Sequence, residues 1–542
     1  MLIENESAAE PRAGRREWIG LAVLALACVL YAMDLTVLHL AIPRLSADLE
    51  PSSAQLLWII DIYGFLVAGS LITMGTLGDR IGRRRLLMIG AGAFGAASIF
   101  AAFSNSAEML IVARAVLGIA GATLAPSTLS LIRNMFLDSH QRTVAISVWI
   151  TSFSVGAAIG PLLGGVMLEF FWWGSVFLLA VPVMAVLLLL GPALLPEFRD
   201  PDAGRLDIVG AGMSLVAVLG VIYGLKQIAQ DGFGASAGLP ILAGLLVGLA
   251  FVRRQARATD PLIDLHLFRR PAFSGSLAIF TLAIFAMFGT FMFIAQYLQL
   301  VLGLTPLEAG VWTLPQSVGF VAGSMFAPQL VRRVRPALVM GGGLLMAATG
   351  LALLTQIGAG SGLPILVIAS VVMSLGLAPV FTLGTDLIVG SAPPERAGVA
   401  SGISETSAEF GGALGIAVLG SIGLAVYRSD VIDGVPAELP AAAADAARDT
   451  LGGAVAAAAQ LPEGLGGALM DAAHVAFTNG LHTTAAIGAV ISVALAVLAT
   501  SLLRNVRPGG GTEELPSDET GAPVLDDDTT VEGLPDPVPA AV

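Results

Sequence analysis

The chain has 542 residues, of which 56% are hydrophobic and only 12% are charged, and its formal net charge is −13. An average soluble domain carries about a quarter charged residues, so the composition excludes an ordinary soluble protein and indicates a polytopic membrane protein. An acidic chain gives no reason to expect a nucleic-acid partner, and nine of its acids lie after Arg507. The single cysteine, Cys28, excludes an intramolecular disulfide and a cysteine-based metal cluster.

Apolar runs long enough to cross a membrane fill most of the chain. Residues 1–17 are polar and arginine-bearing, so we expect a cytoplasmic N-terminal segment before a retained first span. A span needs about 20 mostly apolar residues. Fourteen such runs follow, at 18–41, 55–75, 86–104, 108–131, 144–168, 175–194, 207–227, 238–252, 273–299, 308–330, 337–357, 364–388, 397–425 and 477–503. We expect residues 18–503 to form one transmembrane transporter domain.

The basic residues between the runs predict the orientation of the chain. An even number of spans places both termini on one side. If that side is the cytoplasm, 22 arginines lie inside and only Arg44, Lys226, Arg428 and Arg448 lie outside. Because basic residues concentrate on the cytoplasmic side, we expect a plasma-membrane protein with both termini in the cytoplasm. Residues 428–476 are then a long extracellular loop with surface helices, and residues 504–542 an acidic, disordered cytoplasmic tail.

Acidic side chains inside apolar runs mark the candidate functional residues. Asp34, Asp61, Glu405 and Glu409 lie within or at the rim of such runs. An ionised carboxylate at mid-bilayer costs roughly 2.5–3.5 kcal/mol, so such residues usually face a polar cavity and handle an ion, a proton or a substrate. A fifth acid, Asp386, ends the twelfth run, and we interpret it as an interfacial acid.

Two groups of these acids have the spacing of a cation site. Trp58 and Asp61 share one helical face, and an aromatic ring beside a carboxylate suits a lipophilic cation. An interfacial tryptophan with a rim acid is the alternative. Glu405 and Glu409 lie one helical turn apart on one face. Because like charges repel, this pair can hold a proton and release it when a cation arrives. We expect the substrate to be recognised by Trp58, Asp61, Glu405 and Glu409.

A charged loop separates the second and third runs, at residues 75–85. Its glycines permit a tight reversal, and its acid and arginines can form contacts between helix ends. A simple positive-inside anchor is the alternative. The run resembles the signature loop of the major facilitator superfamily, G-x-L-x-D-R-x-G-R-[RK]-x. The resemblance implies a conformational latch, with gating roles for Gly75, Asp79, Arg80, Gly82 and Arg83.

Two more motifs follow in the order of that superfamily. Arg114 with Gly118 resembles its R-x-x-x-G motif, whose buried arginine is linked to proton transfer. A buried arginine without a partner is costly, so we expect Asp34 as its mate, with a structural arginine bonded to carbonyls as the alternative. The fifth run resembles the antiporter motif G-x-x-x-G-P-x-x-G-G, which implies export. The residues of that motif are Gly156, Gly160, Pro161, Gly164 and Gly165.

Residues 33–43 are similar to the L-D-x-T-x-V-N-x-A-L-P signature of the fourteen-span drug:proton antiporter branch. His39 stands where that branch has asparagine, and we interpret it as a neutral hydrogen-bonding replacement, with a proton relay as the alternative. The acids resemble those of quaternary-ammonium exporters. Those exporters carry another acid early in the tenth span, where residues 315–320 have none, so the preference for monovalent or divalent cations stays open.

The resemblance implies an all-α integral membrane protein with the major facilitator fold, in which 14 transmembrane helices form two six-helix bundles plus two extra central helices. It also implies a proton-coupled multidrug efflux antiporter for lipophilic cations such as quaternary ammonium compounds, dyes and antiseptics. Asp34 and Arg114 would couple transport to protons. Self-resistance export of a neutral or anionic antibiotic, or proton-coupled uptake, are the alternatives. No catalytic, metal or nucleotide-binding motif is visible, so we expect neither an enzyme nor a cofactor.

Overall fold

The structure is a computed structural model that describes residues 12–51, 53–199, 207–231, 234–258, 261–358, 362–393, 396–434, 438–504 and 506. Nearly all of these residues are helical. A backbone in lipid must satisfy its own N–H and C=O groups, and an α-helix does so within a single segment. The apolar composition and the helical structure therefore have one cause.

The first part of the chain forms one half of a helix bundle. Its elements are α1 (Arg15–Leu49), α2 (Ser53–Ile81), α3 (Arg83–Ala102), α4 (Ala107–Met135), α5 (Ser139–Phe170), α6 (Ser175–Leu178) and α7 (Ala180–Leu194). The short α6 and α7 together occupy the sixth predicted span. Two further helices, α8 (Ile208–Asp231) and α9 (Ala235–Gln255), follow the first half.

The second half begins after the short 3-10 helix η1 (Leu265–Arg269). Its elements are α10 (Pro271–Gln296), the π-helical η2 (Tyr297–Val301), α11 (Pro306–Val331), α12 (Pro336–Leu354), α13 (Gly362–Gly390), α14 (Ala397–Gly434), α15 (Ala441–Asp449), α16 (Leu451–Ala458) and α17 (Glu463–Leu502). The small helices α15 and α16 lie in the long connection between residues 428 and 476, where we expected surface helices.

Local signals in the sequence set several helix starts. The hydroxyl of Ser106 accepts a hydrogen bond from an N–H group in the first turn of α4, and the carboxylate of Asp138 does the same for α5. Thr305 forms a capping box at α11. Proline occupies the first turn of α10, α11 and α12, where its missing N–H leaves no bond unmade.

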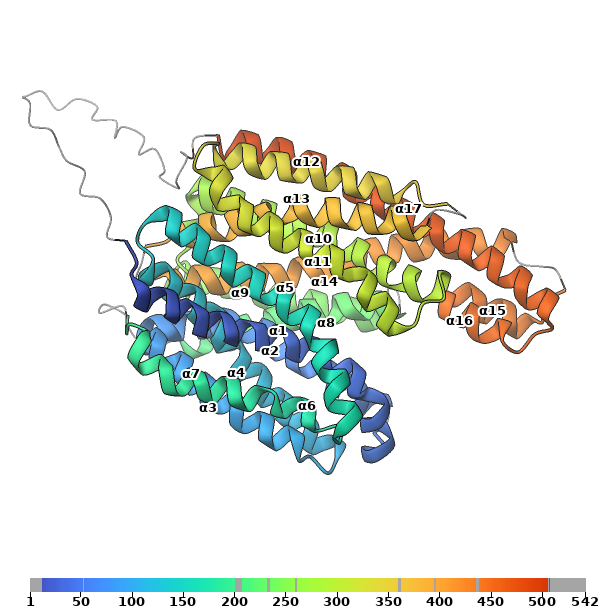
Figure 1. Cartoon of the computed structure of the whole chain (residues 1–542), viewed down its shortest axis with the longest axis horizontal. Helices are drawn as coiled ribbons and strands as arrows, with labels where there is room; N and C mark the ends of the chain where they lie inside the picture. The colour runs from blue at the N-terminus through green and yellow to red at the C-terminus, as the bar shows by residue number, and fades with distance from the viewer. Residues whose placement is uncertain are drawn as a thin grey trace, which may run out of the picture.

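The two halves lie side by side, and α8 with α9 covers a seam between them (Figure 1). Within the first half, α1 packs on α5 and α2 packs on α4. The second half repeats this arrangement, since α10 packs on α14 and α11 packs on α13. The helix α8 contacts both α2 and α14, which belong to different halves. This position makes α8 a neighbour of any site between those two helices.

Thirteen helical segments of the described chain are long and apolar enough to cross a membrane. They correspond to thirteen of the fourteen expected spans. The tenth expected span is α11, which has 26 residues and carries polar side chains and internal prolines, Pro315 and Pro328. Several helices extend beyond the predicted runs, most clearly α14 to Gly434 and α17 from Glu463. Their extra turns project from the bundle beside α15 and α16 (Figure 1).

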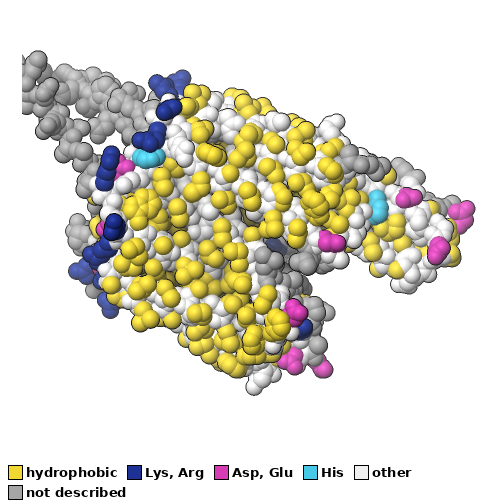
Figure 2. All heavy atoms as spheres, viewed as in Figure 1, with side chains coloured by type: hydrophobic (Ala, Val, Ile, Leu, Met, Phe, Trp, Pro, Cys, Tyr) yellow, Lys and Arg dark blue, Asp and Glu magenta, His cyan; other side chains and the backbone are white. Residues whose placement is uncertain are grey.

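Charged side chains gather at opposite ends of the bundle. Figure 2 shows Lys and Arg side chains along one end and Asp and Glu side chains mainly at the other. We name the first of these the Arg-rich end, where α2 ends and α3 begins, and the second the acid-rich end. Figure 2 also shows the surface indented between the two halves at the acid-rich end. The flanks between the ends are covered by hydrophobic side chains, as a lipid-facing surface requires.

Candidate functional site

Asp34 of α1 and Arg114 of α4 form a buried ion pair. Arg114 Nη1 lies 2.9 Å from Asp34 Oδ2, and the two residues are only 2% and 4% exposed. Arg114 Nε also donates to the carbonyl of Ile59 at 3.2 Å, and its guanidinium lies 4.5 Å from the ring centre of Tyr63. The structure thus brings together the two residues expected to be partners. It also contains the carbonyl bond that the alternative interpretation assumed.

A cavity of about 200 Å³ lies between the halves, with Glu405 of α14 in its wall. Aromatic side chains from both halves form much of the remaining lining: Trp149 and Phe153 of α5, Phe280 of α10, Phe320 of α11 and Phe381 of α13. The indole N–H of Trp149 donates to the hydroxyl of Thr128 at 2.9 Å, which fixes its ring in place. Negative ring faces around one carboxylate form an environment that favours an organic cation.

Glu405 and Glu409 share one face of α14, as their spacing predicted. Glu405 is half-buried, whereas Glu409 is exposed. The Glu409 carboxylate interacts electrostatically with the hydroxyls of Tyr31 and Tyr63. The positive charge of the Lys226 ammonium attracts the same carboxylate. Among the described residues, neither glutamate forms a hydrogen bond or an ion pair. Both carboxylates are therefore available to a ligand.

Asp61 of α2 has a partner that the sequence did not reveal. Its Oδ1 lies 2.5 Å from Nζ of Lys226 on α8, and the same ammonium lies 4.6 Å from the ring centre of Phe65. Trp58 is exposed and packs edge-on against Phe65, with ring centres 6.4 Å apart. We expected Lys226 on the outer side, at the end of the seventh span, and it lies in the second half of α8. The candidate cation site of Asp61 and Trp58 is thus adjacent to an internal cation.

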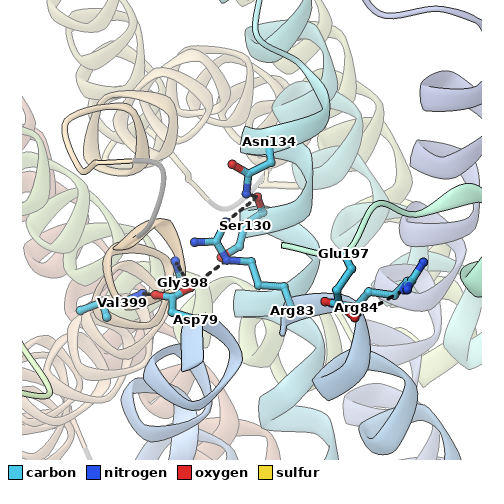
Figure 3. A network of polar contacts seen from close by, with 8 residues as sticks. All are labelled: Asp79, Arg83, Arg84, Ser130, Asn134, Glu197, Gly398 and Val399. Atoms are coloured by element: carbon cyan, nitrogen blue, oxygen red, sulfur yellow. Dashed lines mark hydrogen bonds and ion pairs between the residues drawn. The ribbon is translucent and has the colours of Figure 1, made fainter. Parts of the chain in front are cut away.

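The signature loop joins the two halves at the Arg-rich end (Figure 3). Asp79 Oδ1 accepts from the N–H of Gly398 at 3.2 Å, and Oδ2 accepts from the N–H of Val399 at 3.1 Å. Arg83 Nε holds the same carboxylate at 2.7 Å. The first N–H groups of a helix carry a partial positive charge, so Asp79 of the first half caps α14 of the second. Gly75 and Gly398 let the two backbones meet, because a Cβ at either position would overlap the other helix.

Other residues of this loop stabilise the end of the first half. Gly82 has a φ of +109°, a conformation that L side chains rarely adopt, and a Cβ there would lie 2.6 Å from a carboxylate oxygen of Glu197. Arg83 is fully buried, with its guanidinium 4.9 Å from the ring centre of Phe198. Arg84 pairs with Glu197 at 3.5 Å (Figure 3). Arg80 is half-buried in the last turn of α2.

A second contact between the halves involves Asp386, which is not the interfacial acid that we expected. Asp386 of α13 is only 7% exposed, and its Oδ1 accepts from Arg142 Nε of α5 at 3.0 Å. The hydroxyl of Thr143 donates to Oδ2 at 2.7 Å. The expectation was wrong because a helix of the other half covers this acid. One signal was available: Arg142 lies just before the fifth run, on the membrane side where Asp386 lies at the end of the twelfth.

The antiporter motif forms a close helix contact within the first half. A Cβ at Gly156 of α5 would overlap the carbonyl of Val29 on α1, so the two backbones touch there. A Cβ at Gly165 would meet nothing within 4 Å. Gly160 and Gly164 lie between them on the same helix. The side chain of Pro161, like that of His39 on α1, is outside the described residues.

These contacts together define one conformation of the bundle. The halves are joined at the Arg-rich end through Asp79 and Asp386, and Arg396 adds an exposed pair with Asp264. At the acid-rich end the surface is indented between the halves (Figure 2). The cavity beside Glu405 is therefore closed toward the Arg-rich end. Such an arrangement exposes a central site to one side of the membrane at a time.

Comparison with known proteins identifies relatives over nearly the full chain. Residues 24–416 match the sequence profile of the Major Facilitator Superfamily. The chain is 43% identical to the multidrug efflux pump LfrA of Mycolicibacterium smegmatis, over 90% of this chain and 96% of that protein. It is 38% identical to the methyl viologen resistance protein SmvA of Salmonella typhimurium, over 85% and 93%. It is 34% identical to the tetracenomycin C resistance and export protein of Streptomyces glaucescens, over 89% and 91%.

A solved structure shows the same fold at low sequence identity. The human organic anion transporter MFSD10 matches with a TM-score of 0.58 and 14% identity, covering 89% of this chain and 99% of that protein. At this identity the match concerns the fold alone. Together with the family match, it confirms the predicted fold class, a bundle of fourteen spans with two six-helix halves and two extra helices.

Proposed function

Since this chain belongs to the Major Facilitator Superfamily, we propose that it is a proton-coupled efflux antiporter that exports lipophilic cations. It acts in the plasma membrane, and both termini and the Arg-rich end face the cytoplasm, in accordance with the distribution of basic residues. The relatives named for multidrug efflux and for methyl viologen resistance support export of small organic molecules. The partners are substrate, protons and membrane lipid.

The observation that carries the proposal is the cavity beside Glu405. It combines one carboxylate, on α14, with five aromatic rings from four helices of both halves. Rings and carboxylate attract a cation together, through the ring quadrupole and through Coulomb attraction. A flat or bulky apolar cation finds contact area on the rings in many orientations, which suits a site that accepts several drugs. Glu409, one turn further along α14, supplies a second carboxylate on the same face of the helix.

Proton coupling is assigned to Asp34 and Arg114. Their pair is buried between α1 and α4, where a charged group is stable only with its partner. A proton that binds Asp34 removes the attraction that holds Arg114, and among the described residues the guanidinium then keeps its contacts with the carbonyl of Ile59 and the ring of Tyr63. Protonation therefore changes how α1 and α4 are held together. Glu405 and Glu409 link the binding of protons to the binding of the substrate. A carboxylate that takes up a proton loses its attraction for a cationic substrate.

Alternating access follows from the contacts at the Arg-rich end. Asp79 and Asp386 close the cytoplasmic side in the conformation described here, and their separation opens it. Gly75 and Gly398 allow the two backbones to meet and part, while the Asp79 carboxylate forms the bonds that must break between them. The close contact at Gly156 keeps α1 and α5 moving as one body within the first half.

The test is transport by purified protein in proteoliposomes. With an imposed proton gradient, ethidium is expected to move against its own concentration gradient, and a protonophore should stop it. Asp34→Asn should still bind ethidium yet lose the dependence on the gradient. Glu463→Gln, at an exposed turn of α17, is the matched control and should transport normally. Ethidium transport that continues without a proton gradient would refute the coupling.

A second candidate function is export of a neutral or anionic natural product. The tetracenomycin C exporter of Streptomyces glaucescens favours it, because that relative is named for resistance to an antibiotic. The largely apolar wall of the cavity also accepts uncharged aromatic rings. The two candidates differ in their need for Glu405. Export of a neutral compound should survive Glu405→Gln, whereas export of a cation should not. Uptake by symport, the third possibility, predicts the opposite direction of flux in the same vesicles.

A further inference from the structure

The ion pair between Asp61 and Lys226 has the composition of a cation site that is already filled. Lys226 is the only lysine of the chain and lies on α8, one of the two helices outside the six-helix halves. Its ammonium lies 2.5 Å from the Asp61 carboxylate and 4.6 Å from the centre of the Phe65 ring. A carboxylate and a ring face are the same two partners that would hold an organic cation.

An apolar groove begins beside this pair. It has a volume of about 390 Å³ and lies between α2 and α8, with Trp58, Ile62 and Phe65 on one side and Leu219 and Tyr223 on the other. Trp58 and Tyr223 are 46% and 41% exposed, so the groove opens to the surface of the bundle. The rings of Phe65 and Tyr223 lie 6.1 Å apart and join the groove to the ion pair. An amphipathic molecule can therefore meet apolar walls and a carboxylate at one place.

The pair itself is suited to exchange. The side chains of Lys226 and Asp61 are 38% and 22% exposed, unlike the buried pair of Asp34 and Arg114. A pair with this exposure is less enclosed than the pair of Asp34 and Arg114, so separating its two charges costs less. Lysine carries its charge on a flexible four-carbon stem, so the ammonium can leave the carboxylate without a change of backbone. Its positive charge also acts on the Glu409 carboxylate of α14, so its displacement changes the electrostatic environment of that acid.

We propose that Lys226 is a tethered competitor of the cargo: a lipophilic cation binds with its apolar body in the groove between α2 and α8 and its charge at Asp61, where it displaces the Lys226 ammonium. When the cargo leaves, Lys226 returns to Asp61. The groove is thereby assigned as a second subsite, and the competition lowers the affinity so that the cation can be released. The inference rests on the proposed function, since it names a further subsite for the same cargo.

The experiment measures ethidium binding to purified protein in lipid nanodiscs by fluorescence anisotropy. In Lys226→Gln the competitor is lost, and Kd is expected to fall about three- to tenfold, the size of a partly screened charge interaction. Lys226→Arg keeps the competing charge and should bind within about twofold of the unaltered protein. In the Asp61→Asn background, Lys226→Gln should have no effect, because the contested carboxylate is absent. Leu219→Trp fills the groove and should weaken binding.

The outcomes separate the inference from the proposed function. If the unaltered protein binds no ethidium, the proposed function fails. If it binds ethidium but Lys226→Gln leaves Kd unchanged or raises it, the pair is only structural and the inference fails alone. If Leu219→Trp leaves Kd unchanged, the groove holds something else, such as a lipid chain, and the assignment of the subsite is wrong.

Discussion

Carboxylates at the Arg-rich end and in the central cavity differ in what the opposite half offers them. Asp79 and Asp386 meet N–H groups and a guanidinium across the seam, so they join the two halves. Glu405 meets aromatic rings instead, and no described residue neutralises it. The same functional group therefore joins the halves in one region and, in the function that we propose, binds the substrate in the other. Four predictions test this difference, from the largest expected effect to the smallest.

Asp386→Ala should have the largest effect. It leaves the Arg142 guanidinium buried without its carboxylate, and removing one partner of a buried pair costs about 3–5 kcal/mol. We expect a lower unfolding temperature in detergent and loss of transport. The double variant Arg142→Leu/Asp386→Leu removes both charges and should regain most of the stability. An unchanged unfolding temperature of the single variant would show that this pair does not hold the two halves together at the Arg-rich end.

Gly398→Ala should open the Arg-rich end. Its new methyl group would lie 2.6 Å from the carbonyl oxygen of Gly75 and would also overlap the Asp79 carboxylate. Overpacking of this kind costs about 1–3 kcal/mol, here only in the closed conformation. Spin labels on α3 and α12 should report longer distances across that end. Gly92→Ala on α3, where an added Cβ meets nothing within 4 Å, is the control and should leave the distances unchanged.

Glu405→Gln should affect the cavity without opening the latch. It keeps the shape of the side chain but removes its charge, and we expect roughly tenfold weaker ethidium binding, about 1.4 kcal/mol. Binding of a neutral aromatic competitor should be unchanged. The label distances between α3 and α12 should also stay as they are. A change in those distances would mean that Glu405 contributes to closure as Asp386 does.

Arg396→Ala should have the smallest effect. Arg396 forms a pair with Asp264 at the Arg-rich end, but its side chain is 44% exposed. A pair of this kind contributes about 0.2–1 kcal/mol and is screened by salt. We expect unfolding temperatures within a few degrees of the unaltered protein, and no difference at high salt. An effect as large as that of Asp386→Ala would contradict the view that burial determines which contacts hold the halves together.

Local features of the sequence were enough to predict much of the fold. The apolar runs coincide with the helices because a span must be apolar over its own length, whatever its neighbours are. The boundaries were less accurate where helices leave the bundle, as at the end of α14 and the start of α17. There the chain is no longer apolar, so hydropathy gives no signal. The partnership of Asp34 with Arg114 was also predictable, because few charges occur within spans and each of them needs a partner.

Contacts between distant segments were not predictable in this way. Lys226 and Asp61 are 165 residues apart, and Arg142 and Asp386 are 244 apart. Neither pairing was expected, because the sequence does not state which helix will cover a given charge. The aromatic lining of the cavity was missed for the same reason, since four helices each contribute one or two rings.

The sequence by itself determined that this chain is a helical membrane protein, where its spans lie and which carboxylates are placed among apolar residues. Hydrophobicity and helical periodicity are properties of one or two dozen consecutive residues, so they can be recognised in the sequence alone. The tertiary structure alone decided that Asp386 meets Arg142, that Asp61 meets Lys226 and that Glu405 meets aromatic rings. Those outcomes depend on the packing of whole helices against one another, and a carboxylate becomes a latch or a binding site only through its neighbours.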